Sequence, residues 1–178
     1  GTVDTTGAQL YRSGVTLGQA TTLTSGGDMT FDGAVSGVSL DATAATINLN
    51  AGTIDTTGAQ VYRSGVLLTG DNTLTAGGAI VFLSTVNGGF ALTTTSALDT
   101  SFGGAINIGS LDATAATINL NGGTIGTTGG QNYRSGVLLT VGNTLTAGGD
   151  IVFVGPVSGV SLDATAANIN IHGGSADT

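Results

Sequence analysis

GTVDTTGAQLYRSG at residues 1–14 returns as GTIDTTGAQVYRSG at residues 52–65 and as GTIGTTGGQNYRSG at residues 123–136. Self-similarity at a regular period is typical of stacked repeat architectures, in which each unit buries its apolar face only against its neighbours. The chain is therefore expected to be one continuous stack of repeats rather than several separate domains.

The positions of the copies locate the repeat boundaries. A second phrase, LDATAATINLN, begins at residues 40 and 111, and its variant LDATAANINIH begins at residue 162. For the GTVDTTG phrase, the longer interval separates the second and third copies. For the LDATA phrase, the longer interval separates the first and second copies. Both observations place an insertion inside the middle repeat. We predict a single domain over 1–178 with repeats at 1–51, 52–122 and 123–173, one extra segment at 87–106 inside the second repeat, and the start of a further repeat at 174–178.

Composition narrows the fold class. The chain has no Lys, Glu, Cys or Trp, and it has 32 Gly and one Pro. Its abundant residues are β-branched residues and turn formers, which favour short strands separated by tight corners. Apolar residues make up 40% of the chain but aromatic residues only 4%. These proportions indicate a narrow core filled by aliphatic side chains.

Cutting the chain at its glycines gives segments of similar length, each of which we interpret as one coil. We predict an all-β fold, a single parallel β-solenoid of about ten coils of 16–20 residues, right-handed like other parallel crossovers. The extra segment then adds one whole coil and preserves the stacking. Three interior columns are expected: Val3, Leu23, Leu40, Ile54, Leu74, Leu92, Leu111, Ile125, Leu145 and Leu162; Tyr11, Phe31, Ile47, Tyr62, Phe82, Leu98, Ile118, Tyr133, Phe153 and Ile169; and Val15, Val35, Val66, Val86, Ile106, Val137 and Val157.

Local features add detail to this solenoid. The glycine pairs Gly26-Gly27, Gly77-Gly78 and Gly148-Gly149 are expected at corners that require positive φ. The residue before each tyrosine is Leu, Val or Asn, so that position is expected to face solvent and the tyrosine the core. A buried tyrosine hydroxyl needs a hydrogen-bond partner, which we expect near a corner.

The strings TTGAQVYRSGVLLTGDNTLTAGGAIVF (residues 56–82) and SLDATAATINLNGGTI (residues 110–125) resemble the β-strand repeats of filamentous-haemagglutinin-like exoproteins. These are large secreted adhesins of Gram-negative bacteria, and the resemblance covers nearly the whole chain. It implies a right-handed β-helix that is exported and serves as a stalk or fibre at the outer cell surface or outside the cell. The Arg-Ser after each tyrosine and the lack of Lys and Glu depart from that family.

The charged residues offer few candidate sites. All three cations, Arg12, Arg63 and Arg134, occupy one repeat position and are the candidate binding residues; a solvated or Asp-paired surface arginine is the simpler interpretation. Asp41, Asp112 and Asp163 also recur, and a corner hydrogen bond to backbone explains them without a metal ion. No metal site is predicted, because the calcium-binding glycine repeat is absent. No cofactor is predicted either.

The sequence also has few residues suited to catalysis, so no catalytic residue is assigned. General acid/base catalysis needs two carboxyl groups in different environments, and every plausible group here is either repeated or isolated, including the single histidine, His172. The recurring Thr pairs do not favour an ice-binding array, because they are not repeated in the intervening coils. The net charge of −8 argues against nucleic acid or an anionic membrane as partner, and no segment is apolar enough to insert into a bilayer.

The function expected from these observations is structural and not enzymatic. We expect the chain to form the shaft of a secreted or surface adhesin or of an extracellular fibre. The alternative is a carbohydrate-binding or polysaccharide-cleaving β-helix surface. The expected partners are further copies of the repeat, stacked end to end or joined in a longer chain, and possible glycans of a host or cell surface.

Overall fold

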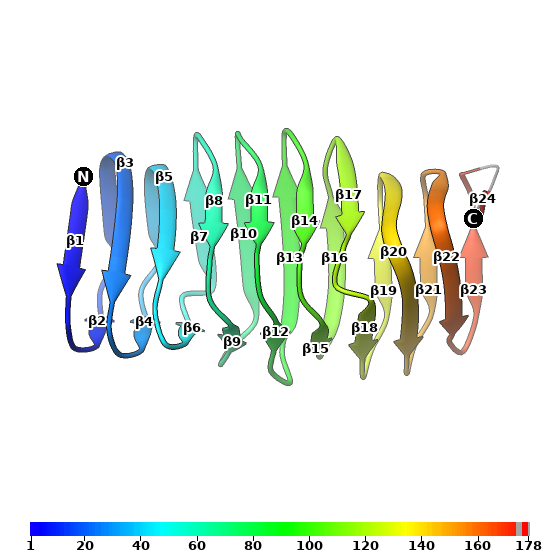
Figure 1. Cartoon of the computed structure of the whole chain (residues 1–178), viewed down its shortest axis with the longest axis horizontal. Coiled ribbons are helices and arrows are strands. Elements are labelled where there is room, and N and C mark those ends of the chain that lie inside the picture. The colour runs from blue at the N-terminus through cyan, green and yellow to red at the C-terminus, as the bar shows by residue number, and fades with distance from the viewer. Residues whose placement is uncertain (174–175, 178) are drawn as a thin grey trace.

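The computed structural model describes residues 1–173 and the backbone of residues 176–177. Within this part of the chain there is no helix, and the strands form one sheet that is wound into a parallel β-solenoid. The coils follow one another along the long axis of the molecule, and the two chain ends lie at opposite ends of the stack (Figure 1). The predicted fold class is therefore confirmed.

The strands are short because polar corners interrupt the apolar segments. The first repeat contains β1 (Thr2–Thr5), β2 (Gln9–Tyr11), β3 (Val15–Ser25), β4 (Met29–Phe31), β5 (Val35–Thr43) and β6 (Ile47–Leu49). The second contains β7 (Thr53–Thr56), β8 (Gln60–Tyr62), β9 (Val66–Leu68), β10 (Asn72–Ala76), β11 (Ile80–Phe82), β12 (Val86–Asn87), β13 (Ala91–Ser96), β14 (Thr100–Phe102), β15 (Ile106–Ile108), β16 (Ser110–Thr114) and β17 (Thr117–Leu120). The third contains β18 (Thr124–Thr127), β19 (Gln131–Tyr133), β20 (Gly136–Ala147), β21 (Ile151–Phe153), β22 (Val157–Thr165) and β23 (Ile169–Ile171).

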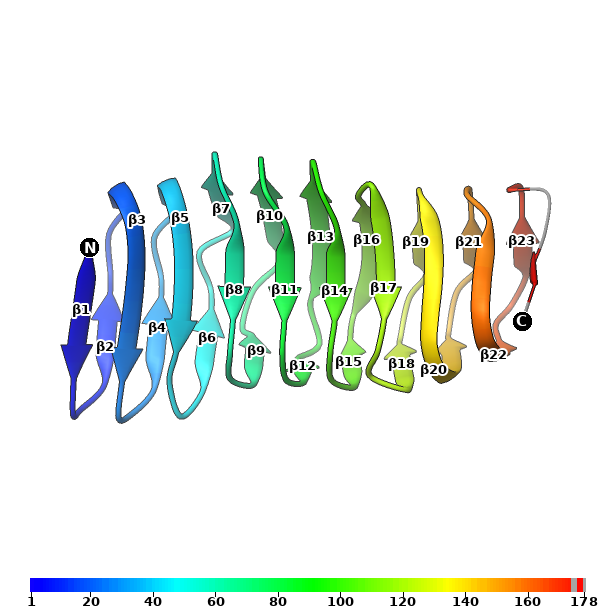
Figure 2. The ribbon, with the colours of Figure 1, turned by 45° about the horizontal axis from the view of Figure 1, so that its top comes forward.

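Each coil has three faces, which Figure 2 shows from a second angle. Strands β3, β5, β20 and β22 cover two faces each, because each bends where its pairing register shifts. Face 1 carries β1, the second halves of β3 and β5, then β8, β11, β14, β17, and the first halves of β20 and β22. Face 2 carries β2, β4, β6, β9, β12, β15, β18 and the second halves of β20 and β22. Face 3 carries the first halves of β3 and β5, then β7, β10, β13, β16, β19, β21 and β23.

The number of turns is smaller than predicted. On face 1, successive pairing leads from Val3 to Gly159 in eight turns, through Leu23, Ala42, Tyr62, Phe82, Phe102, Leu120 and Leu139. Cutting at glycines treats the first repeat as three coils. In the structure that repeat supplies eight strand segments, which fill two and two-thirds turns.

This fractional turn rotates each repeat relative to the one before it. The first repeat begins on face 1 with β1, the second on face 3 with β7, and the third on face 2 with β18. Strand β24 (Ala176–Asp177) then pairs with β22 on face 1 again. Three repeats therefore restore the starting face. Of the expected start of a further repeat at 174–178, residues 174, 175 and 178 lie outside the described part.

The extra segment of the second repeat does add one complete turn. Ile80, Val81 and Phe82 pair with Thr100, Ser101 and Phe102, which lie one turn further along the chain. The rings of Phe82 and Phe102 stack with centroids 5.4 Å apart and planes inclined by 4°. Because the segment is one whole turn, the strands on both sides of it keep their register.

The interior holds most of the predicted core, in a different arrangement. Leu23, Leu74 and Leu145 are at most 2% exposed, as expected of core residues. They lie on faces 1, 3 and 2 respectively, so the predicted columns are wrong as continuous ladders. Leu98 is 58% exposed, because it lies in the turn between β13 and β14, and Phe102 takes the interior position.

The paired glycines at the corners have a different role from the one predicted. Gly26, Gly77 and Gly148 do not have positive φ; among the described residues, the glycines with positive φ are Gly37, Gly52, Gly88, Gly123 and Gly159. A Cβ atom on Gly77 would overlap the carbonyl oxygen of Thr57 on the coil before it, and the same clash arises at the other two corners. These glycines are required for the close approach of two coils.

Candidate functional site

The phrase TTGxQxY builds a buried polar network. Gln60 is fully buried on face 1, and its Nε2 donates to the carbonyl oxygens of Thr75 at 2.7 Å and Ile54 at 3.1 Å and to Oγ1 of Thr56 at 3.2 Å. Its Oε1 accepts a hydrogen bond of 2.9 Å from the hydroxyl of Tyr62. The glutamine thereby joins two neighbouring strands across one corner of a coil.

The same network recurs in the other repeats. Gln131 donates to the carbonyl oxygen of Thr146 at 3.0 Å and accepts from Tyr133 at 2.9 Å. In the first repeat Gln9 donates to the carbonyl oxygen of Thr24 and accepts from Tyr11 at 2.7 Å. The inward tyrosines and their need for a partner are confirmed. Sequence reasoning missed the glutamine, although the fixed Q-x-Y spacing places both side chains on one face of a strand.

Burial governs the chemistry of these tyrosines. Loss of hydration raises the pKa of Tyr62 and of Tyr133 far above the ordinary value for tyrosine. Burial also raises the pKa of Tyr11, which is only partly covered in the first coil. A buried, neutral phenol that already donates to glutamine is a structural group and not an acid catalyst at neutral pH.

The candidate arginines form ion pairs between coils. Nε and Nη2 of Arg63 donate to the two carboxylate oxygens of Asp41 at 2.7 Å each. Arg134 makes the same bidentate pair with Asp112 at 2.6 Å. In both pairs the hydrogen bond and the negative charge of the aspartate raise the pKa of the arginine. Arg63 and Arg134 are thus Asp-paired surface residues, and Asp41 and Asp112 bind these arginines rather than a backbone corner.

The three arginines do not gather into one binding patch. Arg12 follows β2 on face 2, Arg63 follows β8 on face 1 and Arg134 follows β19 on face 3. The rotation of each repeat therefore places the same residue on three different edges of the solenoid. Arg12 and Asp163 are exposed, and neither forms an ion pair with another residue in the described part of the chain.

Reactive side chains are likewise scattered over the rod. Within residues 1–173, no three His, Asp or Glu side chains come together as metal ligands. His172 is exposed on the last coil, where its backbone N–H donates to the carbonyl oxygen of Phe153 at 2.8 Å. Phe90 is the one exposed aromatic residue in the described part, at 42% exposure. The described part of the chain has no helix that is long and apolar enough to cross a membrane.

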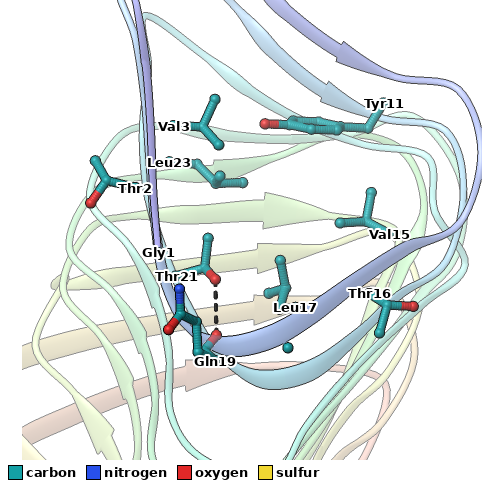
Figure 3. A pocket seen from close by; sticks show the side chains of 11 residues that line it. Gly1, Thr2, Val3, Tyr11, Val15, Thr16, Leu17, Gln19, Thr21 and Leu23 are labelled. Carbon is teal, nitrogen blue, oxygen red and sulfur yellow. Dashed lines mark hydrogen bonds between the residues drawn. The ribbon is translucent and has the colours of Figure 1, made fainter.

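A cavity lies at the first coil. It encloses about 570 Å³ and is lined by Val3, Tyr11, Val15, Leu17 and Leu23, together with polar residues of β1 and β3. Figure 3 shows these apolar side chains directed into the interior of the coil. On the next coil the partners of Val3, Tyr11 and Val15, which are Leu23, Phe31 and Val35, are at most 2% exposed, so this cavity lies at the uncovered end of the core.

Comparison with known proteins identifies no relative: no family model, no curated protein and no solved structure matches this chain.

Proposed function

We propose that this chain is a structural segment of the shaft of a secreted or surface adhesin or of an extracellular fibre, and that it is not an enzyme. The observation that carries the proposal is the continuous pairing of strands on three faces, in which three repeats restore the starting face. A solenoid of this kind is lengthened by whole coils without any change of register, as the extra coil between Phe82 and Phe102 illustrates. The number of coils, and with it the length of the solenoid, can therefore vary while the strand register is kept.

The outer surface supports the same proposal. The outward positions of the central strands are rich in Thr, Ser and Asn, and the recurring charges neutralise one another in the pairs of Arg63 with Asp41 and Arg134 with Asp112. General acid/base catalysis requires carboxyl groups held together in a cleft. A surface whose titratable groups are dispersed along the coils is better suited to a solvated rod.

The proposed location is the outer cell surface or the extracellular medium. This rests on the resemblance of residues 56–82 and 110–125 to exported adhesin repeats. The proposed partners are further copies of the repeat and glycans of a host or cell surface.

Electron microscopy of fused copies tests the proposal. Chains containing one, two and three copies of residues 1–173 in tandem are expected to be straight rods whose length increases in proportion to the number of copies. Compact or bent particles would contradict it. Binding of the same chains to an array of polysaccharides, or cleavage of any of them, would favour the carbohydrate alternative.

A further inference from the structure

The ion pairs between repeats follow one rule. Arg63 pairs with Asp41 and Arg134 pairs with Asp112, and in each case 22 residues separate the partners. Each pair joins the LDATA phrase of one repeat to the YRSG phrase of the next. Two members of the series remain, Arg12 directly after β2 in the first coil and Asp163 in β22 near the last coil.

We propose that the last coil of one copy of this chain binds the first coil of a second copy, and that Asp163 of the first copy pairs with Arg12 of the second. This inference rests on the proposed role as a stacking segment and specifies how two segments meet. The partner is a second copy because its first coil carries the residues that the repeats inside the chain already use at their junctions.

Apolar residues at the two ends match in the same register. At the junction of the first two repeats, Ile47 pairs with Val66 and Leu49 with Leu68, and all four are buried. At the next junction Ile118 pairs with Val137 and Leu120 with Leu139. The equivalent residues between two copies are Ile169 with Val15 and Ile171 with Leu17.

The two isoleucines are uncovered in the single chain, whereas Val15 is half-buried and Leu17 is buried at the edge of the cavity in the first coil. Ile169 is 44% and Ile171 is 47% exposed, and Val15 and Leu17 line the cavity at the first coil. Stacking would therefore place two exposed aliphatic side chains over an apolar cavity and remove both surfaces from water. Burial of apolar surface is the dominant favourable contribution to such association.

Backbone groups would pair in the same way. At the internal junctions the N–H of Arg63 donates to the carbonyl oxygen of Ala42, and the N–H of Ala44 donates to Oγ of Ser64. Arg134, Ala113, Ala115 and Ser135 repeat both bonds. Between two copies the equivalents are Arg12 with Ala164 and Ala166 with Ser13, so the sequence supplies every partner.

Strand β24 competes for one part of this junction. Ala176 pairs with Val157 on face 1, as Ile54 pairs with Val35 at the first internal junction. In a stacked pair this position belongs to Val3 of the second copy. A chain that ends at Gly173 is therefore expected to associate more strongly than the full chain, because β1 of the second copy no longer has to displace β24.

Charge exchange tests the ion pair. In sedimentation velocity at about 0.15 M salt, Arg12→Asp and Asp163→Arg are each expected to weaken association roughly fivefold or more, through repulsion of like charges. The double variant is expected to restore it, since the pair is re-formed with reversed signs. Asp99→Arg is the matched control, because Asp99 is exposed in the middle of the rod. Equal association of all four variants, or failure of the double variant to recover, would overturn the inference.

A disulfide tests the register independently of charge. Asn48 pairs with Leu67 and Asn119 with Leu138 on the outer surface, and the equivalents between copies are Asn170 and Thr16. Adjacent parallel strands lie about 4.8 Å apart, within the range of Cα separations that a disulfide bridges. The chain has no cysteine, so a variant with Thr16→Cys and Asn170→Cys should oxidise to covalent chains of many copies, whereas Thr16→Cys alone should give at most dimers. If the double-cysteine variant also stops at dimers while tandem fusions form straight rods, this inference fails and the shaft function stands.

Discussion

The hydroxyl of Tyr62 donates to Oε1 of Gln60 two residues earlier in the same strand, at 2.9 Å, and both side chains are fully buried. Replacing Gln60 with Leu would leave this hydroxyl and the carbonyl oxygen of Thr75 without their partner. An unsatisfied buried polar group destabilises a protein by about 1–3 kcal/mol. We expect Gln60→Leu to lower the free energy of unfolding by at least about 2 kcal/mol, as measured by denaturant titration.

The network makes the effects of its two members non-additive. Tyr62→Phe alone removes the donor to Gln60, and the combined variant removes both partners at once. Residues that share a hydrogen bond show coupling in a double-mutant cycle. The combined loss should be clearly smaller than the sum of the single losses. Additive effects would show that the glutamine and the tyrosine act separately.

Gly77 is expected to be intolerant of any side chain. Gly77→Ala would place its Cβ against the carbonyl oxygen of Thr57, and backbone at this corner has no freedom to withdraw because Gly77 N–H donates to the carbonyl oxygen of Thr56 at 2.9 Å. Overpacking of this kind destabilises by about 1–3 kcal/mol. Gly89→Ala is the control, since nothing lies within 4 Å of its Cβ position and its φ is not positive. Thermal melting should separate the two variants, and equal melting temperatures would contradict the close-approach argument.

The fold class was predictable because the repeat signal does not depend on knowing where a coil ends. The duplicated phrases, the β-branched composition and the insertion in the second repeat all indicate a parallel stack, and the stacking of Phe102 on Phe82 confirms that the insertion is one turn. The length of a coil was not predictable in the same way. A repeat and a coil have different periods here, and a single sequence shows only the period of the repeat.

This difference explains the errors in the predicted core. The predicted column places Ile54 between Leu40 and Leu74. Ile54 does pair with Leu74, but its other partner on face 3 is Val35 and not Leu40. Burial was still assigned correctly at most positions, because inward residues alternate with outward ones on every face. Leu98 was assigned wrongly, since an apolar residue at a turn cannot be distinguished by composition from one in a strand. Val3 and Ile169 were also expected inside and are exposed, because they lie on the first and last described coils of the stack.

The arginines of the candidate site also show that the sequence does not reveal which residues lie side by side on neighbouring coils. Their repeat position suggested a recurring surface group, and the sequence left open whether it was solvated or paired. The partner of Arg63 is 22 residues away, and only the coil length and the register reveal that Asp41 lies beside it. Longer-range geometry of this kind could not be derived from composition or from motif spacing.

Removal of one complete coil is expected to leave a folded solenoid. In the intact chain, the ladder on face 1 joins Phe82 to Phe102 and Phe102 to Leu120. Deletion of residues 83–102 removes one whole turn, so that Leu120 would pair directly with Phe82. The shortened chain should keep its β-sheet circular dichroism spectrum and a cooperative thermal transition. Deletion of residues 83–92 removes a fraction of a turn and should prevent cooperative folding, because every later strand would meet the wrong partner. Similar melting of both deletion variants would be inconsistent with the observed register.

Alkaline pH is expected to unfold the chain through its buried tyrosines. Burial raises the pKa of Tyr62 and Tyr133, so the folded state holds protons that the unfolded state releases near pH 10. Their contribution to stability is therefore complete below about pH 10 and decreases as the pH rises above that value. Tyrosinate absorbance should show Tyr11 ionising while the chain is still folded, and Tyr62 and Tyr133 ionising together with the loss of β-sheet circular dichroism. The variant with Tyr62→Phe and Tyr133→Phe should lose most of this alkaline transition and should also be less stable at neutral pH. Ionisation of all three tyrosines without unfolding would show that Tyr62 and Tyr133 are accessible to water.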